Sequence, residues 1–170
     1  QAETAGRKPT GRPPRGPDPT QATPKPKAQR NFTDPESRIM KDGATKGFVQ
    51  AYNAQAAVDD TAQVIVAAAV TQEANDKRQL VPMLTAVAAN CGASPAAASA
   101  DSGYFSADAV TDPALADIAL YVAPDRLTHG EPAGGAGPPL APDGTALAAM
   151  RAKLQTAAGQ AVYALRKMIV

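Results

Sequence analysis

The sequence predicts an α/β fold in which helices pack on the faces of a mixed β-sheet. Two stretches rich in β-forming residues, 47–58 and 62–71, flank a short turn and indicate an antiparallel hairpin. Helical segments and short apolar runs then alternate through the rest of the sequence. Strands followed by such an alternation are typical of a mixed sheet flanked by helices.

The composition limits what this sheet can bury. Of 170 residues, 44% are hydrophobic and only 4% are aromatic, and alanine makes up much of the apolar fraction, so the predicted core is thin. No run approaches the roughly 18 apolar residues of a membrane span. The single Cys91 excludes an internal disulfide and is expected to be a buried small hydrophobe. These features predict a cytoplasmic protein that does not enter a membrane.

Residues 1–30 are predicted to form a disordered, proline-rich basic linker. They hold seven prolines and no large apolar side chain, so they cannot bury enough surface to offset the entropy of ordering. Seven basic residues against two acidic ones give this arm a net charge of +5, which leaves −4 for the rest of the chain. Such a basic arm is found in nucleic-acid binders and in solvated linkers. The domain is predicted to span residues 31–170.

The first half of this domain contains the hairpin and one long helix. Turn signals, "DPES" and "KDGATKG", precede the hairpin, and its own turn is predicted at 59–61. Asn75 or Asp76 is predicted to cap a helix that Gly92 ends. The apolar residues of this helix recur at helical spacing: Leu80, Met83, Leu84, Val87 and Ala88.

The second half alternates strands and helices. Residues 95–101 are predicted to form a buried strand that ends at Asp101, and a short helix broken at Pro113 follows. A second buried strand is predicted at 118–123.

The end of the domain combines a loop with a long helix. A flexible Gly/Pro loop is predicted near 128–144, and a single amphipathic helix is predicted from there to Val170. The sequence opens on Gln1 and closes within this helix, which favours a segment of a longer chain.

Asp101 is the candidate for chemistry. Ligands of mixed α/β sheets bind beyond the carboxyl ends of the strands, where Asp101 is predicted to lie and where a carboxylate can hold Mg²⁺. Gly103 is expected to allow a sharp turn, with Tyr104 and Phe105 packing that turn onto the sheet. The alternative is that Asp101 serves only as a helix N-cap or turn residue.

A lone carboxylate does not make a two-metal site, which needs several acidic ligands around ions roughly 3.5–4 Å apart. Most of the other acidic residues lie in predicted turns and are expected to form those turns. They are Asp34, Asp42, Asp59, Asp60, Asp108, Asp112, Asp117 and Asp125.

Several segments carry a resemblance to a known family. In order, they are "AQRNFTDPESRIMK", "GFVQAYNAQAAVDDTAQVIVAAAVTQEANDKRQLVPML", "ADSGYFS", "YVAPDR" and "AVYALRKMIV". Apart from the Gly/Pro loop, residues 28–170 resemble the C-terminal half of bacterial insertion-sequence transposases of the DDE class. The resemblance is closest to the group whose catalytic domain is interrupted by a helical insertion.

This resemblance implies an RNase H-like fold, incomplete here because its first strand has no counterpart. It implies Mg²⁺- or Mn²⁺-dependent DNA cleavage and strand transfer by two Asp and one Glu, with insertion-sequence ends and target DNA as partners. Asp101 matches the second acid of the family and is implied to be a catalytic residue and metal ligand. On this resemblance the sequence begins inside the linker that follows the first acid.

The third acid of the family follows a helix signature that this sequence matches at Tyr163, Arg166 and Lys167. These three residues are candidates for contacts to the DNA backbone. The alternative is that they form only a basic helix end at the surface. The Glu itself would come directly after a segment like "RKMIV", at which the sequence stops.

Three functional hypotheses follow. The first is a transposase fragment that is inactive alone. The second is a non-enzymatic, DNA-binding or regulatory protein that pairs with the intact enzyme, and a homo-oligomer is a further expected assembly. The third is a small metal-dependent nuclease that Asp59 or Asp60 completes.

Overall fold

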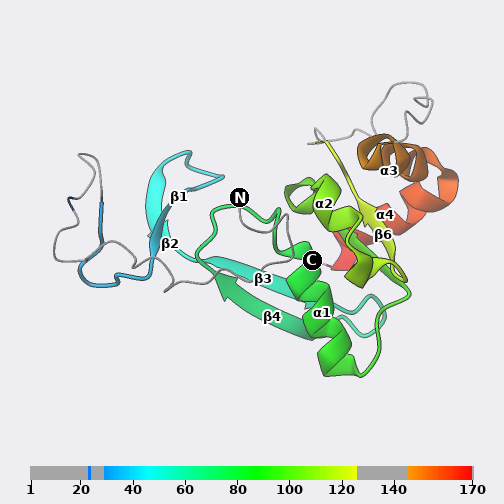
Figure 1. Cartoon of the computed structure of the whole chain (residues 1–170), viewed down its shortest axis with the longest axis horizontal. Coiled ribbons are helices and arrows are strands. Elements are labelled where there is room, and N and C mark those ends of the chain that lie inside the picture. The colour runs from blue at the N-terminus through cyan, green and yellow to red at the C-terminus, as the bar shows by residue number, and fades with distance from the viewer. Residues whose placement is uncertain (1–22, 24–28, 126–144, 170) are drawn as a thin grey trace, which may run out of the picture. The chain divides into compact units, whose positions relative to one another are not determined.

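A computed structural model of the chain describes Thr23 and residues 29–125 and 145–169, with only the backbone given at Lys167 and Ile169 (Figure 1). The chain divides into two compact units, residues 1–35 and 36–170. In the first unit, the side-chain oxygen of Asn31 accepts the N–H of Thr33 at 3.0 Å. Most of the predicted linker and the predicted Gly/Pro loop lie outside the described residues and stay predictions.

The second unit opens with a hairpin that the sequence did not predict. Strands β1 (Arg38–Lys41) and β2 (Phe48–Ala51) pair antiparallel. Asp42 holds the turn between them, since its carboxylate accepts the backbone N–H of Thr45 at 2.9 Å and also its hydroxyl. These hydrogen bonds, led by that from the Thr45 hydroxyl, hold the pKa of Asp42 below its ordinary value. Only the turn signals were recognised, because β1 is four residues long.

The predicted hairpin is confirmed in β3 (Asn53–Val58) and β4 (Ile65–Thr71), which pair antiparallel. Its first strand was predicted to begin at 47, and this was wrong. The chain changes partner at Tyr52, because the residues before it pair with β1 and those after it pair with β4. The turn between β3 and β4 depends on Asp59, whose carboxylate accepts the N–H of Ala62 at 2.6 Å.

Helix α1 (Leu80–Cys91) packs against β3 and β4 (Figure 1). Its buried residues follow the predicted spacing, and they are Leu80, Met83, Leu84 and Val87. Gly92 ends the helix in the left-handed conformation with φ of 73°, as predicted. The predicted cap was wrong, because α1 starts after Gln79 without a side-chain cap and the Asp76 carboxylate bonds to β3 instead. Cys91 is exposed rather than buried.

Strands β5 (Ala97–Ala100) and β6 (Ala119–Val122) form a parallel pair, close to the predicted bounds. Three short helical segments connect them: η1 (Ser102–Tyr104), α2 (Ala107–Val110) and η2 (Pro113–Leu115). The predicted break at Pro113 is confirmed, because this proline opens η2 behind an Asp112 cap.

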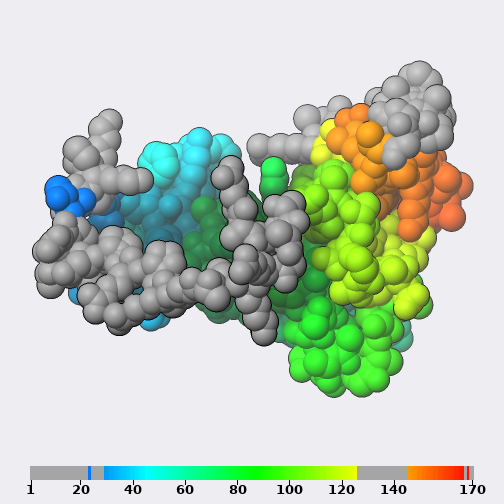
Figure 2. Space-filling view, viewed as in Figure 1, coloured from blue at the N-terminus to red at the C-terminus, as the bar shows by residue number. Residues whose placement is uncertain are grey.

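The predicted C-terminal helix is two helices, α3 (Ala146–Gln155) and α4 (Ala157–Ile169). The single-helix prediction failed at Thr156, whose backbone is extended with ψ of 150°. The Thr156 hydroxyl accepts the N–H of Gly159 at 3.0 Å, and this bond satisfies a donor that the first turn of α4 leaves free. The surface of α3 adjoins that of α2 in the space-filling view (Figure 2).

The main core lies between these helices and the β5–β6 pair. Leu154 and Val122 are its largest fully buried side chains. Around them lie Leu80, Leu84, Ala109, Leu115, Ile118, Leu120, Ala123, Met150 and Tyr163. Two of these, Ala109 and Ala123, are alanines, and the others are large.

The described strands form three two-stranded sheets, not the single mixed sheet that was predicted. β3 is paired along one edge to β4, β5 is paired along one edge to β6, and no described strand bridges their other edges. The α/β class itself is confirmed, because helices pack against the antiparallel pair β3–β4 and the parallel pair β5–β6. Within the described ranges, no helix is long and apolar enough to cross a membrane.

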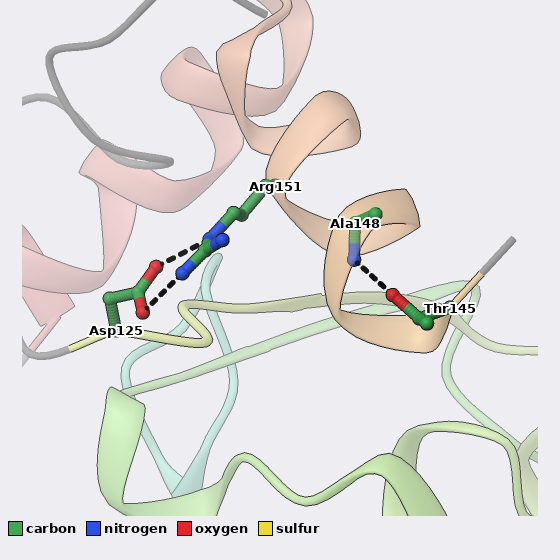
Figure 3. Close-up of polar contacts among 4 residues, drawn as sticks. All are labelled: Asp125, Thr145, Ala148 and Arg151. Carbon is green, nitrogen blue, oxygen red and sulfur yellow. Dashed lines mark hydrogen bonds and ion pairs between the residues drawn. The ribbon is translucent and has the colours of Figure 1, made fainter. Parts of the chain in front are cut away.

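An ion pair joins the end of β6 to α3 (Figure 3). The Arg151 guanidinium donates to both Asp125 oxygens at 2.7 Å, and α3 begins where the Thr145 hydroxyl accepts the N–H of Ala148 at 3.2 Å. The hydrogen bonds from Arg151 hold the pKa of Asp125 below its ordinary 3.8.

Because the pKa of folded Asp125 is lowered, the pair stabilises the protein above the unfolded-state pKa, and this stabilisation is lost as the pH falls through the folded-state value. The Asp125 side chain is 42% exposed, so we expect Arg151→Gln to cost only about 0.5 kcal/mol at neutral pH. Urea unfolding of both proteins at about pH 7 and about pH 2, where Asp125 is protonated, measures this. A difference that persists at acidic pH would show that the ion pair is not its cause.

Candidate active site

Asp101 follows the last residue of β5 and is exposed. Its carboxylate oxygen Oδ1 accepts the N–H of Gly103 at 2.8 Å, and its backbone carbonyl accepts the N–H of Tyr104 at 3.2 Å. Asp101 therefore has the capping role that was its alternative interpretation, as the N-cap of η1. The same hydrogen bonds fix an exposed carboxylate at the carboxyl end of a parallel strand, where the sequence placed the candidate site.

Gly103 separates the Asp101 carboxylate from a second one. A Cβ atom at Gly103 would lie 3.0 Å from Asp101 Oδ1 and 3.0 Å from Asp76 Oδ2, so these two oxygens are at most 6.0 Å apart. Among the described residues, Gly92 is the glycine with a positive φ. A side chain at position 103 would therefore press on two carboxylates, and the backbone here is not in the left-handed conformation that a sharp turn would need.

Asp76 belongs to a polar network that joins β3 to this turn. Its Oδ1 accepts amide hydrogens from Asn53 at 2.6 Å and from Gln55 at 2.8 Å. Gln55 is 3% exposed, and its side-chain carbonyl accepts the hydroxyl of Tyr104. Burial, with smaller contributions from Asp76 and Asp101, raises the pKa of Tyr104 to about 12. Tyr104 therefore stays protonated at neutral pH and can donate this hydrogen bond.

Helix α4 also borders this region, since it is in contact with β5. Tyr163 is 5% exposed, and the Arg166 guanidinium lies 4.8 Å from the centre of its ring. Burial raises the pKa of Tyr163. The charge of Arg166 acts to lower this pKa, and the charge of Asp101 acts to raise it further. The charge of Asp101 thus acts on Tyr163, beside which Arg166 lies.

The predicted site residues therefore divide into two groups. The structure brings Asp101, Tyr163 and Arg166 into one region, whereas the side chain of Lys167 is outside the described part of the chain. Arg166 Nε is buried without a hydrogen-bond partner among the described residues. A shallow hollow of about 170 Å³ between α2 and α3, lined by other residues, contains none of these side chains.

The other acidic candidates are occupied elsewhere. Asp59 accepts backbone N–H groups of its own turn, and Asp60 accepts the Thr61 hydroxyl at 3.2 Å, as expected of turn residues. No group of three or more His, Cys, Asp or Glu residues able to hold a metal occurs within the described ranges. Asp101 and Asp76 do supply carboxylate oxygens, the donor type that Mg²⁺ prefers, so the region fits part of a metal site.

Sequence reasoning missed Asn53, Gln55 and Asp76 as parts of this region. A signal for the first two was present, because residues two apart on a strand share a face. A buried amide needs polar partners, and "YNAQ" supplied two amides on one face of β3. Asp76 gave no such signal, because an Asp just before a helical segment is the pattern expected of a helix cap.

Comparisons with known proteins place the chain in a family. The family described as Transposase DDE domain matches residues 18–124, more than half of the chain, including Asp76 and Asp101. No curated protein and no solved structure that was compared matches it. The match ends before α3, so it does not extend to Tyr163 and Arg166. On the strength of this match, the chain belongs to the Transposase DDE domain family.

Proposed function

We propose that this chain is part of a DNA transposase of a bacterial insertion sequence, with Asp101 as one of the carboxylates that hold its catalytic metal. Membership of the family implies a transposase function and DNA as a partner. The observation that supports the assignment to Asp101 is its exposed carboxylate at the end of β5, beside a second carboxylate. Ligand sites of α/β sheets lie at this position.

Mg²⁺ or Mn²⁺, when bound there, would stabilise charge on the transferring phosphoryl group. Residues of this chain orient the metal ligand and bring a positive charge close to it. The Gly103 N–H fixes the Asp101 carboxylate, and Arg166 brings a guanidinium to the same region. We infer that Arg166, with Lys167, contacts the DNA backbone and that buried Tyr163 holds Arg166 in place by stacking.

The family uses three acids, and only Asp101 has a match among the 170 residues. A lone aspartate holds Mg²⁺ weakly, because the ion dehydrates reluctantly. We therefore expect no strand transfer from this polypeptide alone. A further strand between the free edges of β3 and β5 would join two of the small sheets into an RNase H-like mixed sheet. The hydrogen bond between Gln55 and Tyr104 supports this, because it already links the two parts.

Binding of Mn²⁺ to the full chain tests the assignment of Asp101. We expect Mn²⁺ to broaden the amide NMR signals of residues 101–104, and Asp101→Asn to weaken this binding at least about tenfold because it removes the ligand charge. The matched control is Asp117→Asn, which removes the charge of another exposed acid. Broadening that survives in Asp101→Asn, or that is absent from the unmodified chain, would refute the assignment.

A second test concerns DNA. We expect Arg166→Gln to weaken binding to duplex DNA about threefold and to reduce the salt dependence by about one phosphate contact, because one cation is lost. Fluorescence anisotropy at several salt concentrations measures both quantities. Arg78→Gln is the control, since Arg78 is a mostly exposed arginine near the start of α1. Equal losses in the two variants would indicate only non-specific attraction.

A further inference from the structure

We propose that Asp76 is a positioning residue for Asp101: it anchors the side chains that fix the turn carrying the Asp101 carboxylate, and its second oxygen restricts where that carboxylate can lie. The inference rests on the proposed role of Asp101 as a metal ligand. Asp76 itself is assigned no contact with the reacting groups.

The first step is the orientation of Gln55. A glutamine amide has a donor end and an acceptor end, and its neighbours decide which way it points. Asp76 Oδ1 accepts hydrogens from both Asn53 and Gln55, so the donor end of Gln55 faces Asp76. The acceptor end is thereby directed to the hydroxyl of Tyr104.

The second step connects Tyr104 to Asp101. Both belong to one turn, in which the Tyr104 N–H donates to the Asp101 carbonyl at 3.2 Å and the Gly103 N–H donates to Asp101 Oδ1 at 2.8 Å. Hydrogen bonds therefore link Asp76 to Gln55 and Gln55 to the hydroxyl of Tyr104, and the backbone of Tyr104 is bonded to Asp101. Because Gln55 is buried, loss of its carboxylate partner would leave a buried amide unsatisfied.

The third step is the charge across Gly103. Asp76 Oδ2 and Asp101 Oδ1 lie on either side of this glycine, at most 6.0 Å apart. Like charges at this separation repel, and they also favour a cation between or beside them. Asp76 thus acts on Asp101 in two separable ways, through the hydrogen-bonded chain and through its charge.

Two variants separate these effects. Asp76→Ala removes both, whereas Asp76→Asn keeps a side-chain oxygen for the amides of Asn53 and Gln55 and removes the charge. Tyr104→Phe breaks the chain at its far end and keeps the aromatic ring. Tyr121→Phe is the matched control, because Tyr121 is another half-buried tyrosine, and its ring, which Lys153 faces at 4.1 Å, is retained.

The experiment measures two quantities in the full chain. Hydrogen exchange of the Gly103 amide reports on Asp101, to which this amide donates, and Mn²⁺ broadening of residues 101–104 gives the apparent metal affinity. We expect Asp76→Ala to speed Gly103 exchange about tenfold and to weaken Mn²⁺ binding about tenfold. Asp76→Asn should weaken Mn²⁺ binding about threefold with nearly unchanged exchange, and Tyr104→Phe should mainly speed exchange.

The outcomes that overturn the proposal are distinct from a failure of the proposed function. If the Gly103 amide exchanges at the same rate in Asp76→Ala as in the unmodified chain, the positioning role is wrong. If exchange rises equally at Gly103 and at amides of α3, Asp76 is only a stabilising residue. Absence of Mn²⁺ broadening in the unmodified chain would instead refute the role of Asp101, and the exchange data would still decide whether Asp76 fixes the turn.

Discussion

Gly159→Ala is expected to destabilise the protein strongly, although alanine is normally the better helix former. A Cβ atom at this position would overlap the carbonyl oxygen of Lys153 and lie 3.0 Å from the carbonyl carbon. These are backbone atoms, so they cannot move aside as the end of a flexible side chain could. Replacing glycine within a helix usually gains up to about 1 kcal/mol. Here the steric overlap outweighs this gain in helix propensity, because relieving it requires the end of α3 and the start of α4 to separate.

We expect a loss of about 3 kcal/mol, at the upper end of overpacking effects, and a melting temperature lower by about 6–12 °C. Thermal unfolding followed by circular dichroism measures it. Gly43→Ala is the control, because nothing lies within 4 Å of a Cβ atom built there. A Gly159→Ala protein that is more stable than the original would mean that α3 and α4 are not held this closely.

The elements that sequence reasoning predicted well are those whose signals are local. The spacing of Leu80, Met83, Leu84 and Val87 marks α1 whatever the rest of the chain does, and Gly92 ends it for a local steric reason. The β3–β4 hairpin has β-branched residues on both sides of an Asp turn. Asp101 was likewise placed at the end of its strand from the residues around it alone.

The features that sequence reasoning missed depend on partners distant in the sequence. The change of partner at Tyr52 is decided by β1. The break at Thr156 is an exception, because it had a local signal in the Thr156 hydroxyl that caps α4. Asp76 resembles a helix cap locally, yet its carboxylate bonds to residues more than 20 positions earlier. The same holds for the link between Gln55 and Tyr104, which are 49 positions apart. No pattern within one segment encodes such pairings.

Leu154→Ala is expected to be the most damaging large-to-small change in the core. Leu154 is fully buried, and together with Val122 it is one of the two largest side chains with no exposed surface in the described part of the chain. It belongs to α3, which packs against both β6 and α4. Removing a buried leucine side chain costs about 2–5 kcal/mol, depending on how far the neighbours can close the cavity.

We expect a loss of about 4 kcal/mol, near the top of this range, because Leu154 has no exposed surface and belongs to the largest cluster of buried side chains. Urea unfolding gives this value from the change in midpoint. The control is Leu165→Ala on α4, where the leucine is 40% exposed, and its loss should stay below about 1 kcal/mol. Because α4 carries Tyr163 and Arg166, the Leu154→Ala protein should also bind DNA more weakly at temperatures where it remains folded. Equal losses of stability for the two leucines would show that the core is not centred on α3.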